Sequence, residues 1–348
     1  MVTIAVFMGV LAFVTGKVVG YPLRDPDGFL GPAWVRLPLL LLGAFAIDII
    51  PRTLWRSRGR VNRLVPEGRL LIREHWTKER ITLVVLGLVC FYVTYVSYRN
   101  LKNFLVFVRG SQTRQGDYEL HKLDHFLLFG HDPGILLHNL LGTGISAQVL
   151  SVDYLFFLPM VPVSVTVWLV WSRNVSFGYW FVTAQCIAWT LGTASYYMIP
   201  TMGPNFAFEW IYQSVNHTGA GSLVESLWWG RYYVKHDPLA TTGVQSVAGF
   251  ASLHVAITLL MALVGQYTLR HRPFKIILWV YMGLTVLSTT YFGWHYIADD
   301  IAGAMIAFIA FYLGGIASGQ RFDARGRHSH PTTTTEHVPV DEPEPVSR

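Results

Sequence analysis

The chain has 348 residues, of which 52% are hydrophobic and 14% charged, and its mean hydropathy is +0.38. This composition is too apolar for an ordinary soluble domain and is typical of a polytopic membrane protein. The formal net charge of +6 does not indicate nucleic-acid binding, because the basic residues lie in connections between apolar runs, where membrane orientation explains them. Cys90 and Cys186 lie inside apolar runs and predict neither a disulfide framework nor a thiolate metal site.

Apolar runs long enough to cross a membrane recur along the chain. A helix that crosses the hydrocarbon core needs about 20 residues. Eight candidate spans lie near residues 1–20, 34–51, 80–98, 153–172, 178–199, 248–268, 274–292 and 296–317. We therefore predict an all-α fold, a polytopic bundle of membrane helices.

Two long connections and a polar tail complete the organisation. Residues 99–152 and 200–247 mix aromatic and aliphatic residues with polar ones at helical spacing, which is typical of helices that lie in the membrane interface. Residues 318–348 are rich in Pro, Thr and charge and predict a disordered tail. The expected units are then 1–79, two N-terminal spans with a basic loop; 80–317, the membrane-embedded core; and the tail.

Basic residues are concentrated on one side of the predicted membrane. With eight spans, the N-terminus, the loop 52–79, the connections near 173 and 270 and the tail share that side. The loop alone contains seven arginines from Arg52 to Arg73. The positive-inside rule predicts that this side is cytoplasmic, so the two long connections are extracytoplasmic.

The segment "STTYFGWHYIADDIAGA", residues 288–304, places ionisable residues at the start of the last span. Charged groups at membrane depth are costly and are usually paired or functional. His295 and Asp299 are four residues apart and share a helical face. A carboxylate beside an imidazole can hold one ring nitrogen as N–H and leave the other free as a base or nucleophile. A buried, satisfied polar pair is the alternative.

A second polar group stands at the start of the sixth span, in "GFASLHVAI", residues 249–257. Backbone N–H groups of a first helical turn and the Ser252 hydroxyl can bind phosphate, and His254 can protonate a leaving oxygen. A Ser N-cap and an interfacial His are the alternative. By span counting, His254 and His295 lie at similar depth on the extracytoplasmic side.

These residues resemble the type 2 phosphatidic acid phosphatase superfamily. "ASLH" and the later "HYIAD" are similar to its second and third motifs, P-S-G-H and S-R-x5-H-x3-D, and the resemblance covers about residues 80–317. The S-L-H variant and the preceding "YYMIPTMGP" look closest to the branch of inositol phosphorylceramide synthases. The resemblance implies a six-helix core, a nucleophilic His295 that becomes phosphohistidine, its orienting partner Asp299, the acid His254, and Ser252 as phosphate ligand.

The sequence departs from that family pattern where positive charge is needed. Thr289 replaces the phosphate-binding Arg of the third motif, and the Lys and Arg of the first motif are not found before His254. A phosphoryl group still needs cations for its oxygens. We predict that Arg231 and Lys235 supply them, because they lie in the connection that leads into "ASLH"; interfacial snorkelling is the alternative.

A metal is not predicted. His121 and His125 in "HKLDHFLLFGHDP" have the i, i+4 spacing of a zinc pair, but the H-E-x-x-H pattern is not complete. The segment also fits an interfacial helix ending at Gly130, which we prefer. We expect neither a metal nor another cofactor.

The residues and the resemblance together predict a multi-pass cell-membrane enzyme, a lipid phosphatase or phosphotransferase with an extracytoplasmic active site. Its substrate would be a phospholipid or an isoprenoid phosphate or diphosphate. Water as acceptor makes a phosphatase, and an inositol or sugar acceptor makes a head-group transferase. Two rivals of another class are a proton-coupled transporter in which Asp299, Asp300 and His295 form a proton relay and a non-catalytic membrane scaffold.

Overall fold

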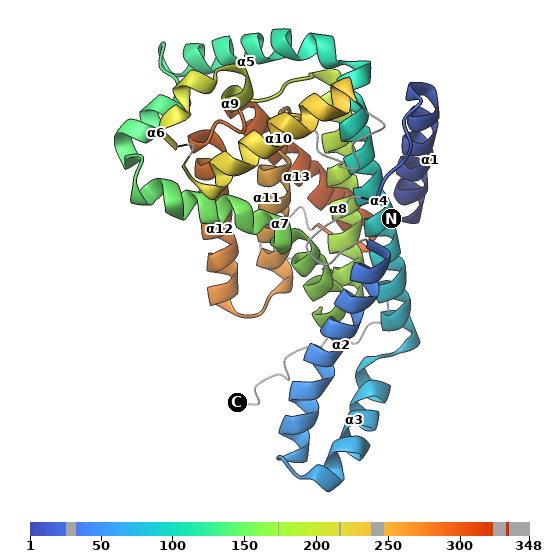
Figure 1. The fold of residues 1–348 in the computed structure, drawn as a ribbon. Helices are drawn as coiled ribbons and strands as arrows, with labels where there is room; N and C mark the ends of the chain where they lie inside the picture. The colour runs from blue at the N-terminus through green and yellow to red at the C-terminus, as the bar shows by residue number, and fades with distance from the viewer. Residues whose placement is uncertain (26–32, 173, 216, 238–246, 323–331, 334–348) are drawn as a thin grey trace.

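The computed structural model describes residues 1–25, 33–172, 174–215, 217–237, 247–322 and 332–333, and within them the chain is almost entirely helical (Figure 1). The α-helices are α1 Val2–Val19, α2 Ala33–Ser57, α3 Val61–His75, α4 Lys78–Val108, α5 Thr113–Leu127, α6 Pro133–Leu141, α7 Ile145–Trp171, α8 Val175–Met198, α9 Pro204–Ala207, α10 Gly219–His236, α11 Leu253–Thr268, α12 Arg272–Tyr291 and α13 Ile297–Ala317. Three single-turn 3₁₀ helices (Gly110–Gln112, Glu209–Ile211, Gln213–Val215) and one antiparallel pair, β1 Gln320–Arg321 with β2 Thr332–Thr333, complete the described residues. The prediction of an all-α membrane bundle is confirmed.

Each of the eight predicted spans corresponds to one helix: α1, α2, α4, α7, α8, α11, α12 and α13. Six of them are long and apolar enough to cross a membrane, and α11 is apolar but shorter. The exception is α8, which carries buried polar residues such as Thr183, Gln185 and Thr193. It packs against α4, α7, α11 and α13. Because protein rather than lipid surrounds α8, its side chains need not be uniformly apolar.

Local sequence signals set several helix starts. Thr77, Asn174, Thr218 and Ser252 each cap a helix by accepting a backbone N–H with the side-chain oxygen. At the C-terminal end of α1, Gly20 adopts the left-handed backbone conformation in which helices commonly end. Polar residues between the apolar runs thus mark where the spans begin.

The largest departure from the predicted boundaries concerns α4. The apolar run suggested a span ending near residue 98, yet the helix continues to Val108, because Leu101, Phe104 and Leu105 remain buried against the bundle. Arg99 and Lys102 therefore stand on a membrane helix rather than in a connection. α7 likewise begins at Ile145, eight residues before the predicted run at 153.

The connections gather at the two ends of the bundle. α5, α6, α9 and α10 fill the two long connections and cover the end at which α4 finishes, whereas α3, inside the arginine-rich loop, lies at the opposite end with α2 (Figure 1). Helices in the long connections were expected, but α3 was not.

The first residues of the predicted tail are packed. Gln320 is buried and donates a hydrogen bond to the Ser176 hydroxyl at 2.9 Å, and the Phe322 ring contacts Trp180 and Phe311. Residues 323–331 and 334–348, which make up most of the predicted disordered tail, lie outside the described residues. The packed core thus extends to Phe322.

Candidate active site

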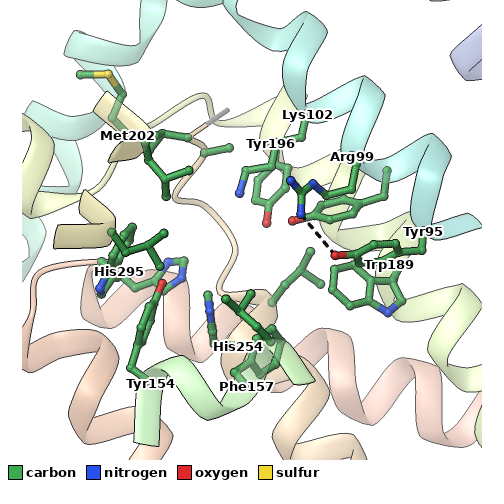
Figure 2. A pocket seen from close by; sticks show the side chains of 18 residues that line it. Tyr95, Arg99, Lys102, Tyr154, Phe157, Trp189, Tyr196, Met202, His254 and His295 are labelled. Atoms are coloured by element: carbon green, nitrogen blue, oxygen red, sulfur yellow. Dashed lines mark hydrogen bonds between the residues drawn. The ribbon is translucent and has the colours of Figure 1, made fainter. Parts of the chain in front are cut away.

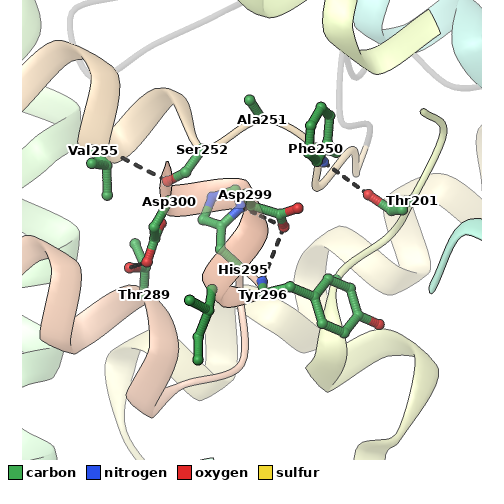
Figure 3. A network of polar contacts seen from close by, with 12 residues as sticks. Thr201, Phe250, Ala251, Ser252, Val255, Thr289, His295, Tyr296, Asp299 and Asp300 are labelled. Carbon is green, nitrogen blue, oxygen red and sulfur yellow. Dashed lines mark hydrogen bonds and ion pairs between the residues drawn. The ribbon is translucent and has the colours of Figure 1, made fainter. Parts of the chain in front are cut away.

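The His295 ring is held by a carboxylate at the start of α13. Its Nδ1 atom lies 3.3 Å from Oδ2 of Asp299, which also accepts the backbone N–H of Tyr296 at 3.0 Å (Figure 3). The His295 side chain is 6% exposed and that of Asp299 is fully buried. Burial lowers the pKa of His295, so the ring is neutral near pH 7. A proton on Nδ1, donated to Asp299, leaves Nε2 with its lone pair.

The second histidine faces the first. The His254 and His295 ring centroids are 5.7 Å apart. His254 lies in the first turn of α11 and is stacked on Tyr154 at 4.7 Å, while Phe157 packs at 4.2 Å. These aromatic rings of α7 hold the imidazole in one position. The two predicted catalytic histidines therefore occupy one site, although 41 positions separate them in the sequence.

Both histidines line a cavity of about 240 Å³ (Figure 2). Arg99 and Lys102 of α4 line it too, among aromatic residues that include Tyr196. Figure 2 shows the two cationic side chains across the cavity from His295. Their spacing of three residues places them on one helical face. The cavity thus combines two imidazoles with two cations, which suits binding of an anionic group.

The predicted phosphate ligands lie elsewhere. The described lining of the cavity does not include Ser252, Arg231 or Lys235. Ser252 is fully buried and caps α11 by accepting the Val255 N–H, Arg231 is half-buried on α10, and Lys235 is exposed. From α10 the cavity receives Leu223 and Leu227 instead.

Sequence reasoning missed Arg99 and Lys102 because the apolar run ended before them. The signal available was an Arg and a Lys one helical turn apart, immediately after a predicted span on the side of the histidines. An uninterrupted helix with Leu101, Phe104 and Leu105 on its buried face would have placed both cations within the bundle.

The residue at the family's Arg position has a structural role. Thr289 is fully buried, and its hydroxyl donates to Oδ2 of Asp300 at 3.2 Å (Figure 3). Thr290 donates to the same oxygen at 3.4 Å. Asp300 therefore joins α12 to α13, and it is not among the described residues that line the cavity.

Two aspartates of α5 support the site from outside. Asp117 accepts hydrogen bonds from the backbone of Met202 and Gly203 and from the Tyr296 hydroxyl, at 2.9 to 3.2 Å. Asp124, two turns later on the same face, accepts the backbone N–H of Ile297 at 3.2 Å. A carboxylate at a helix N-terminus is favourable. Helix α5 thus holds the first turn of α13, directly after His295.

Comparison with known proteins gives one match. A sequence profile of the PAP2 superfamily matches residues 118–313, which is more than half of the chain and includes His254, His295 and Asp299. No significant match was found among curated proteins or among solved structures. The match confirms the superfamily that the motifs resemble, and the inositol phosphorylceramide synthase branch stays a prediction. With more than half of its length matched, the chain belongs to the PAP2 superfamily, and this membership indicates a phosphatase or phosphotransferase of a phosphorylated lipid.

Proposed function

We propose that this membrane protein transfers the phosphoryl group of a phosphorylated lipid through a phosphohistidine at His295. The observation that carries the proposal is the pairing of a neutral, Asp299-bound His295 with a second imidazole, His254, in one cavity that also contains Arg99 and Lys102. Such a set supplies a nucleophile, an acid and the positive charge that phosphoryl transfer needs.

The reaction proceeds in two steps. Nε2 of His295 attacks phosphorus, a P–N bond forms, and the P–O bond to the lipid alcohol or lipid phosphate breaks as His254 gives its proton to the leaving oxygen. Asp299 stabilises the charged ring, and Arg99 and Lys102 bind the phosphoryl oxygens. An acceptor hydroxyl then loses its proton to His254, attacks phosphorus and releases His295.

The acceptor decides the reaction class. Water gives a phosphatase, and an inositol or sugar hydroxyl gives a head-group transferase of the inositol phosphorylceramide synthase type. A volume of about 240 Å³ is below the range usual for sites that enclose a drug-sized ligand. It suits a phosphorylated head group, while the apolar chain of the lipid stays between the helices and the membrane.

The cavity faces the extracytoplasmic side in this proposal. It lies toward the end of the bundle covered by α5 and α10, and the arginine-rich α3 lies at the other end (Figure 1). The positive-inside rule places such an arginine-rich segment in the cytoplasm. Reaction at the outer membrane surface follows from this orientation.

The test uses protein purified in detergent with a panel of lipid phosphates and diphosphates, with and without inositol or sugar acceptors. Wild type and His295→Ala are compared for free phosphate and for phosphorylated inositol or sugar. Free phosphate that disappears in the variant identifies a phosphatase, and an acceptor-dependent phosphorylated inositol or sugar that disappears identifies a transferase. Equal behaviour of the two proteins across the panel would reject the catalytic proposal in favour of transport or scaffolding.

A further inference from the structure

A second cluster of ligand-type side chains lies outside the cavity, between α5 and α6. His121 and His125 project from one face of α5, and Asp132 precedes the first residue of α6. One ligand atom from each residue lies within 4.8 Å of the other two. The sequence expectation of no metal rested on the incomplete H-E-x-x-H pattern and on the fit to an interfacial helix. The sequence does not show that Asp132 lies beside the two histidines, because that depends on how the intervening turn folds.

The geometry points to a divalent transition-metal site formed by His121, His125 and Asp132, which we propose as a new site of this protein. Nε2 of His125 lies 2.9 Å and Nδ1 of His121 lies 3.5 Å from the same oxygen, Oδ1 of Asp132. Ligands about 2.0–2.2 Å from a tetrahedral zinc ion stand roughly 3.3 Å apart. The two observed distances lie on either side of that value.

The donor set selects the class of metal. Two imidazole nitrogens and one carboxylate oxygen suit Zn²⁺ and related first-row ions, whereas Mg²⁺ and Ca²⁺ prefer oxygen ligands. Three protein ligands leave room for water at a further position. The side chains of His121, His125 and Asp132 are 21%, 36% and 17% exposed, so an ion can enter from solvent.

Neighbouring residues set the positions of the ligands. The His121 ring is stacked on Phe208 with centroids 4.0 Å apart, which fixes its rotation. The chain reverses at Phe129 and Gly130, both with positive φ, and this turn brings Asp132 back to the histidine face. An ion bound there would join the end of α5 to the start of α6. Since Asp117 and Asp124 of α5 hold the segments around His295, the ion would stiffen the support of the active site.

The test measures metal binding and does not depend on the proposed activity. Tag-free full-length protein in detergent is stripped with EDTA and dialysed, and bound Zn²⁺ per chain is then measured by equilibrium dialysis. We expect one ion more per chain in wild type than in His121→Ala, His125→Ala or Asp132→Asn. The control is His131→Ala, which removes an exposed histidine of the same turn and should leave the stoichiometry unchanged. Zn²⁺ should also raise the unfolding temperature of wild type and of His131→Ala, but not of His121→Ala.

Two results would overturn the site. One is the absence of zinc binding to wild type, which would reduce the cluster to a His125–Asp132 hydrogen bond. The other is an equal stoichiometry in wild type and His121→Ala, which would place the bound ion elsewhere. His121→Ala leaves that hydrogen bond intact, so it serves as the deciding variant even if His125→Ala or Asp132→Asn does not fold.

Discussion

Oδ2 of Asp299 lies 3.3 Å from Nδ1 of His295 and 3.0 Å from the backbone nitrogen of Tyr296. One carboxylate oxygen therefore fixes both the tautomer of the imidazole and the residue that caps α13. His295, the proposed nucleophile, is held at the junction between a loop and a membrane helix, where its orientation depends on the helix itself.

Asp299→Asn tests the tautomer role. The amide oxygen can still accept the Tyr296 N–H, but the negative charge that stabilises the His295 ring is lost. We expect kcat for phosphate release to fall by about 10²–10⁴-fold, as for other Asp–His pairs whose carboxylate is replaced by an amide. Thermal unfolding of the same preparations checks the fold. A folded variant with wild-type kcat would contradict the orienting role.

The source of positive charge is tested by matched neutral substitutions. Arg99→Gln and Lys102→Gln should each lower kcat/KM by about 10²-fold, because each removes a charge from the lining of the cavity in which the phosphoryl group is proposed to bind. Arg231→Gln and Lys235→Gln also remove one positive charge each, but from residues that are not in the described lining of the cavity. They should leave kcat/KM within a few-fold of wild type. Steady-state kinetics on the substrate found in the panel measures kcat/KM for each variant. A larger loss of kcat/KM in Arg231→Gln and Lys235→Gln than in Arg99→Gln and Lys102→Gln would support the cations predicted from the sequence.

A substitution at Gly303 tests the packing of α13 against α11, which places the motifs "HYIAD" and "ASLH" side by side. A Cβ at this position would overlap the backbone carbonyl oxygen of Ser252, where α13 approaches the start of α11. Gly303→Ala should destabilise the protein by about 1–3 kcal/mol, since backbone must shift to make room.

Gly283→Ala in α12 is the matched control, because no described atom lies within 4 Å of the added Cβ. Alanine is the better helix former there and should be neutral or stabilising by up to about 1 kcal/mol. Apparent melting temperatures in detergent give the comparison. Equal melting temperatures for Gly303→Ala and Gly283→Ala would mean that the backbones of α11 and α13 approach each other less closely than the structure shows.

The raised pKa of Asp117 predicts that the stability of the protein depends on pH. Burial raises its pKa to about 6 in the folded protein, above the ordinary value of 3.8. Between these values the folded state keeps a proton that the unfolded state has lost, so the free energy of unfolding falls as pH rises. The melting temperature of wild type minus that of Asp117→Asn should decrease from about pH 4 to pH 6 and level off above.

The opposite slope for Asp117 would also be informative. It would mean that the hydrogen bonds from Met202, Gly203 and the Tyr296 hydroxyl lower the pKa more than burial raises it. Far-ultraviolet circular dichroism at each pH shows whether both proteins begin the unfolding scan with the same helical content.

The sequence by itself determined the class of fold, the eight helical spans and the superfamily. These follow from local patterns, because a run of apolar residues specifies a membrane helix and a motif such as H-x3-D has its spacing within one helical turn. His295 and Asp299 could therefore be paired from the sequence, and His254 could be added from its place at the start of another span on the same side, in agreement with the family resemblance.

Only the tertiary structure decided which residues of distant segments share the cavity. That Arg99 and Lys102 line the cavity, while Arg231 and Lys235 do not, depends on how far α4 continues past its apolar run and on how α10 lies across the bundle. The support of α13 by Asp117 and Asp124 likewise depends on helix packing. Charge and spacing along the chain do not contain that information, because a side chain reaches a site by the rotation and length of its helix.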